Sequence, residues 1–143
     1  MTNHPTPPPG TLQHTLGQHR VVLMEGGRAT IEYDAGMHMC HSGGVVQGGF
    51  ISGWIDAAMA HAAISLTGRE TSPMSLEMKV SYFAPARPGR LVAEGWVERM
   101  GKSTCFAEGV LKDSKGTVVA KATSTIRLIP LSKVEEGSRA ART

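Results

Sequence analysis

The apolar pattern of this chain changes its period near residue 67, and that change limits the folds open to it. Residues 49–66 are alanine-rich, and Asp56 and His61 are their only ionisable side chains. Alanine favours the helix, and a helix with so few polar residues is covered on most of its surface. Gly68 then supplies a plausible C-terminal stop. The pattern predicts one long, buried helix.

Residues 75–83 alternate instead, so that Leu76, Met78, Val80 and Tyr82 face one way. Three more strand-like runs follow at residues 91–99, 104–111 and 118–129, and residues 113–116 form a turn between the last two. Residues 28–33 are a further possible strand, whereas residues 38–47 are typical of a loop. Strands that follow one long helix predict an α+β fold, with the helix on one face of an antiparallel sheet.

The chain has 143 residues, which suits one domain. Its proline-rich start, residues 1–12, predicts a flexible tail, because consecutive prolines resist both helix and sheet. We place the domain at residues 13–131 and a polar C-terminal tail at residues 132–143.

Charge and composition exclude several classes of function. A net charge of +3 without a long basic run gives no sign of nucleic-acid binding. Cys40 and Cys105 are too few for a disulfide framework, and the start of the chain lacks the pattern of a signal peptide. The helix carries Asp56 near its middle, which disfavours a membrane span. We therefore expect a cytoplasmic protein.

His38, Cys40 and His41 resemble half of a zinc site, but no matching second pair exists. We therefore expect no metal. The sequence also lacks the motifs of serine hydrolases, zinc proteases and dinucleotide-binding enzymes.

Gly48 and Gly49 precede the apolar helix, and Asp56 lies within it. Backbone N–H groups at a helix start are unpaired and partly positive, and glycine lets a ligand approach them. Such a site suits a carbonyl oxygen that becomes an oxyanion. A carboxylate among apolar residues can be a hydrogen-bonded structural group, or it can act as a general base or nucleophile.

Residues 41–56, HSGGVVQGGFISGWID, resemble the signature of hotdog-fold acyl-CoA thioesterases of the phenylacetyl-CoA and 4-hydroxybenzoyl-CoA thioesterase-like group. That signature has Asn, five residues, His-Gly-Gly, six residues and Asp. Residues 75–89, 113–116 and 120–125 resemble the family's next strand, last hairpin and last strand. The resemblance covers roughly residues 36–128 and implies a hotdog fold, a long central helix wrapped by an antiparallel sheet.

The resemblance implies a role for each matching residue. Asp56 falls at the catalytic carboxylate, Gly48 at the backbone donor to the thioester carbonyl, and Ser75 at a serine that positions the attacking water. His41 stands where the family has Asn or Gln, and Gln47 stands where it has His. The implied reaction is hydrolysis of an acyl-CoA to free acid and coenzyme A, with no cofactor beyond the coenzyme A of the substrate.

The family also implies a homodimer, often paired into a homotetramer, in which Asp56 of one subunit faces Gly48 of the other. Gly49 and Trp54 are candidates for contact with the substrate. The candidate cations for coenzyme A are Arg87, Arg90, Arg99 and Lys102.

Three alternatives remain open on the sequence. The chain could bind acyl-CoA without hydrolysing it, or it could be a hotdog enoyl-CoA hydratase in which His41 acts with Asp56. It could also be an inactive structural homo-oligomer. The sequence does not indicate which acyl group is bound.

Overall fold

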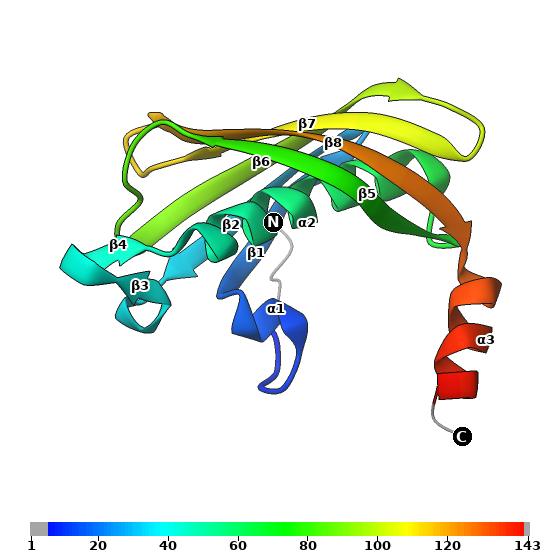
Figure 1. Cartoon of the computed structure of the whole chain (residues 1–143), viewed down its shortest axis with the longest axis horizontal. Helices are drawn as coiled ribbons and strands as arrows, with labels where there is room; N and C mark the ends of the chain where they lie inside the picture. Colours follow the sequence, from blue (N-terminus) through cyan, green and yellow to red (C-terminus); the bar gives the residue numbers. More distant parts are fainter. Residues whose placement is uncertain (1–5, 142–143) are drawn as a thin grey trace.

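The computed structural model describes residues 6–141. Its main feature is a six-stranded antiparallel sheet in the order β1-β2-β6-β7-β8-β5, curved around the long helix α2, as Figure 1 shows. The predicted α+β fold is confirmed. The elements of the sheet and its helix are β1 (Gln18–Glu25), β2 (Arg28–Ala35), α2 (Gly48–Thr67), β5 (Thr71–Tyr82), β6 (Gly89–Met100), β7 (Thr104–Lys112) and β8 (Val118–Pro130).

Helix α2 packs on the concave face of the sheet through one stripe of side chains. The buried positions recur at spacings of three and four residues, which puts them on the same face. They are Ile51, Trp54, Ile55, Ala58, Met59, Ala62 and Ala63. The helix ends at Gly68, whose φ of 80° and N–H bond to the Ile64 carbonyl form the predicted C-terminal stop.

Two strand glycines let the helix backbone approach the sheet closely. A Cβ atom on Gly95 of β6 would lie 2.5 Å from the backbone carbon of Ala58. A Cβ atom on Gly109 of β7 would lie 2.6 Å from Ile55 Cγ2. Any larger residue at either position would push the helix off the sheet, so these glycines fix the depth at which α2 lies.

Strand β5 differs from the predicted alternation at one point. The register against β8 shifts between Ser75 and Glu77, which marks a bulge or irregularity in the ladder. Met78 and Val80 are half-buried as expected, but Leu76 is 60% exposed. The prediction that Leu76 shares their face is wrong, because the irregularity changes the phase of the strand. Ser75, predicted to face away, points at the helix instead.

The connection before α2 is more ordered than the predicted loop. A short 3-10 helix, η1 (Met37–Met39), leads into an antiparallel pair formed by β3 (Cys40–His41) and β4 (Val45–Val46), and a second one, η2 (Ser42–Gly44), connects these two strands. Strand β1, which the sequence analysis missed, forms the edge of the sheet opposite β5. Its apolar residues do not alternate with polar ones, so the period-2 signal is weak.

One further helix lies at the start of the predicted domain, and another lies in the predicted C-terminal tail. The short helix α1 (Leu12–Thr15) is capped by the Thr11 side chain, which accepts from the His14 N–H. The helix α3 (Leu131–Ala141) occupies most of the predicted polar tail and buries none of its residues. Figure 1 shows α3 projecting away from the sheet. The flexible-tail prediction for residues 1–5 lies outside the described residues.

Candidate active site

Asp56 and Ser75 form the first half of the candidate site. Asp56 lies on the side of α2 that faces β5, and its carboxylate is half-buried. The Ser75 hydroxyl donates to Asp56 Oδ1 at 2.6 Å. One carboxylate oxygen therefore has a fixed donor, while Oδ2 has no partner among the described residues. The bulge in β5 creates this contact, since a regular strand would turn Ser75 away from the helix.

The start of α2 forms the second half. Gln47 is the N-cap residue, and its side-chain oxygen accepts from the Gly49 N–H at 2.7 Å. The Tyr82 hydroxyl donates to the Gly48 carbonyl oxygen at 3.1 Å. The Gly48 N–H has no partner among residues 6–141, as the sequence prediction of an open oxyanion donor requires.

A hollow of about 380 Å³ opens beside Gly48. Its walls are mostly apolar, and it includes the exposed His41 side chain and the Tyr82 ring. Phe83, which is 62% exposed, forms another part of the wall. An apolar hollow with one backbone donor at its side suits the hydrocarbon part of an ester or thioester whose carbonyl lies on Gly48.

The two halves lie too far apart to act together within one chain. Asp56 follows Gly48 by eight residues of continuous helix, which places the two backbones about 12 Å apart along the axis. A thioester carbon must lie within about 3 to 3.5 Å of its attacking atom. One chain therefore presents the Asp56 carboxylate and the Gly48 N–H at two different places.

Trp54 is not available to a substrate, which corrects the prediction of a substrate contact. Its side chain is fully buried, and its indole N–H donates to the Leu16 carbonyl at 2.6 Å. Its ring stacks on Tyr33 of β2 with centroids 5.5 Å apart. Gly49 is exposed, and its N–H donates to the Gln47 side chain, so its contact with the substrate stays a prediction.

Tyr33 is an unusual member of the core. Its side chain is fully buried, and its hydroxyl has no hydrogen-bond partner among the described residues. Burial raises the pKa of this phenol well above its usual range, and the negative charge of Asp56 raises it further. Tyr33 therefore stays neutral.

The four candidate cations fall into two groups. Arg87 and Arg90 line a second hollow of about 330 Å³ together with Lys115, and this hollow shares Pro85 with the apolar one. Arg99 and Lys102 are exposed near the other end of β6. Strand β6 has 12 residues and is therefore roughly 36 Å long, so the two groups of one chain are far apart.

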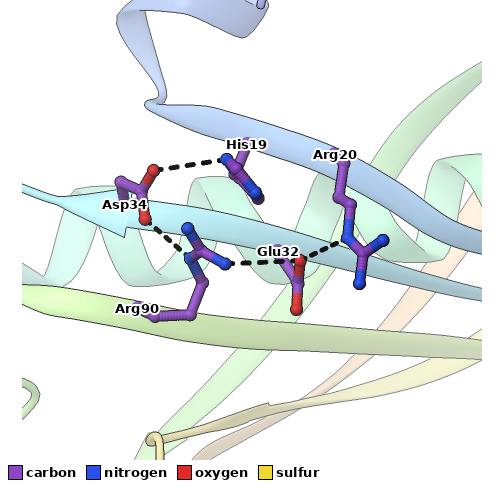
Figure 2. A network of polar contacts seen from close by, with 5 residues as sticks. All are labelled: His19, Arg20, Glu32, Asp34 and Arg90. Atoms are coloured by element: carbon purple, nitrogen blue, oxygen red, sulfur yellow. Dashed lines mark hydrogen bonds and ion pairs between the residues drawn. The ribbon is translucent and has the colours of Figure 1, made fainter. Parts of the chain in front are cut away.

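Arg90 already has two carboxylate partners, as Figure 2 shows. Its guanidinium contacts Asp34 at 2.7 Å and Glu32 at 3.4 Å. Glu32 also pairs with Arg20 at 2.7 Å, and His19 lies 3.6 Å from Asp34. The hydrogen bond to Asp34 is the main cause that raises the pKa of Arg90. Arg90 is thus engaged in a network across β1, β2 and β6, whereas Arg87 donates to the Gly43 carbonyl and to no other group in the described part of the chain.

Within residues 6–141, no three His, Cys, Asp or Glu side chains are grouped closely enough to hold a metal ion. Cys40 of the H-x-C-H run directs its thiol to the Gly36 carbonyl, at 3.6 Å. No helix in the described part of the chain has the length and apolar character needed to cross a membrane.

Comparison with known proteins identifies the family. The model of the thioesterase superfamily matches residues 43–120, which include Gly48, Asp56 and Ser75. The chain belongs to the thioesterase superfamily. A curated relative from Saccharolobus solfataricus, named "Putative esterase SSO2140", is 31% identical over 103 residues, which are 72% of this chain and 73% of the relative.

Solved structures show the same hotdog fold. A phenylacetic acid degradation-related protein from Ralstonia eutropha JMP134 is 30% identical and superimposes with a TM-score of 0.75, over 85% of this chain and 92% of that one. The PaaI protein of the E. coli phenylacetic acid degradation operon is 20% identical, with a TM-score of 0.75 over 82% of this chain and 83% of that one. The predicted thioesterase resemblance and hotdog fold are confirmed, and the family supports thioester hydrolysis as the general reaction.

Two residues at the site of this thioesterase were not predicted from its sequence. Tyr82 was counted only as a strand residue, although it reaches the helix start from 34 positions away. Lys115 was read as part of a turn, although it lines the hollow that contains Arg87. Neither contact has a local signal in the sequence, since each depends on how distant segments meet.

Proposed function

We propose that this thioesterase hydrolyses an acyl-CoA, with Asp56 as general base or nucleophile and the Gly48 N–H as oxyanion donor. The observation that carries the proposal is the half-buried Asp56 carboxylate, held by the Ser75 hydroxyl at 2.6 Å and open at its other oxygen. Ser75 fixes the carboxylate without neutralising it, so that Oδ2 is free to accept a proton from water.

In the base route, Asp56 takes a proton from a water molecule, and the water oxygen attacks the thioester carbon. The carbonyl electrons move onto the oxygen, where the Gly48 N–H and the partial positive charge of the helix start stabilise them. The C–S bond then breaks, and the coenzyme A thiolate takes the proton from Asp56. In the nucleophile route, Asp56 attacks the carbon directly, and the C–S bond breaks to release the coenzyme A thiolate. Water then hydrolyses the mixed anhydride to the free acid and the Asp56 carboxylate, and this water supplies the proton of the released thiol. His41, on the wall of the hollow, would help to hold the water in either route.

The 12 Å separation within one helix requires a second copy of the chain. Strand β5 is an edge of the sheet, and it has exposed apolar side chains at Met74, Leu76 and Tyr82. On this strand, Ser75 contacts Asp56 in one half of the site, and Tyr82 contacts Gly48 in the other half. An antiparallel β5–β5 pair centred near Met78 and Lys79 would bring Asp56 of one subunit to Gly48 of the other. We propose this homodimer, which further pairing would extend to a homotetramer.

The neighbouring hollow would hold the phosphates of coenzyme A. It continues from the apolar hollow at Pro85 and contains Arg87, Lys115 and the already paired Arg90. Guanidinium and ammonium groups are the usual partners of phosphate. In the proposed dimer, each site also receives the exposed Arg99 and Lys102 from the subunit that supplies Asp56. The proposal needs no cofactor and places the reaction in the cytoplasm.

Thiol release from a panel of acyl-CoAs tests the proposal. We expect the parent chain to release free coenzyme A and Asp56→Asn to lose at least about a hundredfold in kcat, because the amide cannot accept the proton. Addition of water to an enoyl-CoA without thiol release would favour the hydratase instead. Asp56→Asn activity near the parent level would contradict the proposed role of Asp56.

A further inference from the structure

We infer that Tyr82 is a positioning residue, which together with Gln47 clamps the peptide group between Gly48 and Gly49 so that the Gly48 N–H is held open for the substrate. The inference rests on the proposed function, because it concerns the same oxyanion donor. It adds a residue from the edge strand β5 to the machinery at the helix start.

The clamp acts on both ends of one peptide group. The carbonyl oxygen of Gly48 accepts from the Tyr82 hydroxyl at 3.1 Å. The N–H of the same peptide group, which belongs to Gly49, donates to the Gln47 side-chain oxygen at 2.7 Å. A peptide group is planar, so two opposed hydrogen bonds fix its orientation. The adjacent Gly48 N–H is then also held close to one orientation.

The clamp can form because residues 48 and 49 are both glycine. A Cβ atom on Gly49 would lie 2.6 Å from the Gln47 side-chain oxygen, a clash with the capping group. A Cβ atom on Gly48 would lie 3.1 to 3.3 Å from the hydroxyl oxygen and ring carbons of Tyr82, closer than ordinary contact. The glycine pair therefore lets the Gln47 and Tyr82 side chains contact the helix start, and it also leaves room for a ligand.

The clamp also selects the donor. Gln47 satisfies the Gly49 N–H, and the Phe50 N–H donates to the Gln47 backbone carbonyl at 3.0 Å. The Gly48 N–H is left without a partner in the described chain, at the wall of the apolar hollow that Tyr82 also lines. An oxyanion donor is effective only when it is fixed before the charge develops. Tyr82 supplies part of that fixation from the strand on which we propose that the dimer forms.

The experiment compares two substitutions that each delete one phenolic oxygen, since the chain has two tyrosines. Tyr82→Phe removes the bond to Gly48, whereas Tyr33→Phe removes a hydroxyl that has no partner among the residues the structure describes. We expect Tyr82→Phe to lower kcat roughly five- to tenfold, the value of one ordinary hydrogen bond, with KM changed less than twofold. We expect Tyr33→Phe to leave both constants at the parent level.

A third variant tests whether the two bonds act on one group. Gln47→Leu removes the other half of the clamp, and we expect the kcat loss of the double variant with Tyr82→Phe to be smaller than the product of the two single losses. Two-dimensional NMR of the full chain gives a readout apart from activity. The Gly49 amide resonance should move in Tyr82→Phe and stay in place in Tyr33→Phe.

The outcomes separate this inference from the proposed function. Parent-like kcat in Tyr82→Phe, or a change in KM alone, would overturn the positioning role while leaving thioester hydrolysis intact. An unmoved Gly49 resonance would overturn the clamp itself. A parent chain that releases no thiol from any acyl-CoA would overturn the proposed function, and the NMR comparison would still decide whether the clamp exists.

Discussion

The two tyrosines of this chain lie near opposite edges of the sheet, and they differ in what surrounds them. Tyr33 of β2 is fully buried and stacks on Trp54 of α2, and its hydroxyl has no hydrogen-bond partner within residues 6–141. Tyr82 of β5 is half-exposed, and its hydroxyl holds the helix start. The same residue type therefore packs in the core on β2 and belongs to the candidate site on the edge strand β5.

The polar groups around them follow the same division. Near β1 and β2 they are used internally: the Trp54 indole bonds to Leu16, and Glu32 and Asp34 are paired with arginines. Near β5 the Gly48 N–H and one oxygen of Asp56 remain available. Substitutions at the β5 side should therefore change the reaction rate, and those at the β1–β2 side should change only stability.

The largest effects are expected at the two halves of the site. Gly48→Pro deletes the N–H at the first helical position, where proline is well tolerated, and Gln47 already has the extended φ of −65° and ψ of 136° that a residue before proline needs. We expect kcat to fall about 10²–10³-fold. Gly48→Ala, which keeps the N–H but adds the same crowding against Tyr82, is the control and should lose much less.

Mixing two inactive variants tests whether the site is shared between subunits. In a heterodimer of Gly48→Pro and Asp56→Asn, one of the two sites would combine an intact Asp56 with an intact Gly48. Equal mixing with subunit exchange should therefore restore about a quarter of the parent activity, by the statistics of pairing. If the mixture stays as inactive as its parents, while size measurements show that the subunits have exchanged, the site does not span the dimer.

A smaller rate effect is expected from the residue that holds the base. Ser75→Ala removes the hydrogen bond to the Asp56 carboxylate, and bonds to charged groups contribute about 1.5–3 kcal/mol. We expect a loss of roughly ten- to a hundredfold in kcat, measured as thiol release. Ser72→Ala on the same strand is the control, because the Ser72 hydroxyl has no partner among the described residues. Equal losses in both would point to damage to β5 itself.

In the core, Tyr33→Phe should stabilise the protein by about 1 kcal/mol, because it deletes a buried hydroxyl that has no hydrogen-bond partner in the described part of the chain. The effect should depend on pH. The pKa of Tyr33 is higher in the folded chain than in the unfolded one, so its phenol favours the unfolded state once pH exceeds about 10. Denaturant unfolding should show stability falling more steeply above that pH in the parent than in Tyr33→Phe. Parallel pH curves would contradict the burial argument.

The smallest effect is expected in the ion-pair network. Arg90→Gln breaks the contacts with Asp34 and Glu32 that Figure 2 shows, but these groups are partly exposed, so the loss should stay below about 1 kcal/mol and shrink in high salt. Arg99→Gln, which breaks no ion pair in the described chain, is the stability control. A stability loss of several kcal/mol for Arg90→Gln would show that the network is more than a surface feature.

The sequence by itself determined the elements that have a strong local period. The apolar run after Gly48 predicted α2 almost to the residue, and the runs after residue 88 predicted β6, β7 and β8. It also singled out Asp56, because a carboxylate in an apolar helix is costly without a partner. Such features depend on a few neighbouring residues, so they can be read from the chain directly. Strand β1 was missed because its pattern is not periodic.

Only the tertiary structure decided which side chains meet. The irregularity in β5 turned Ser75 toward Asp56 and Leu76 toward solvent, against the alternation of the sequence. Tyr82 reached Gly48 across 34 positions, and Trp54 was sealed in the core instead of facing a substrate. Each of these contacts joins segments distant in the chain, and their energies depend on strand register and helix depth. Local periodicity contains neither quantity, so the detailed shape of the site came from the fold.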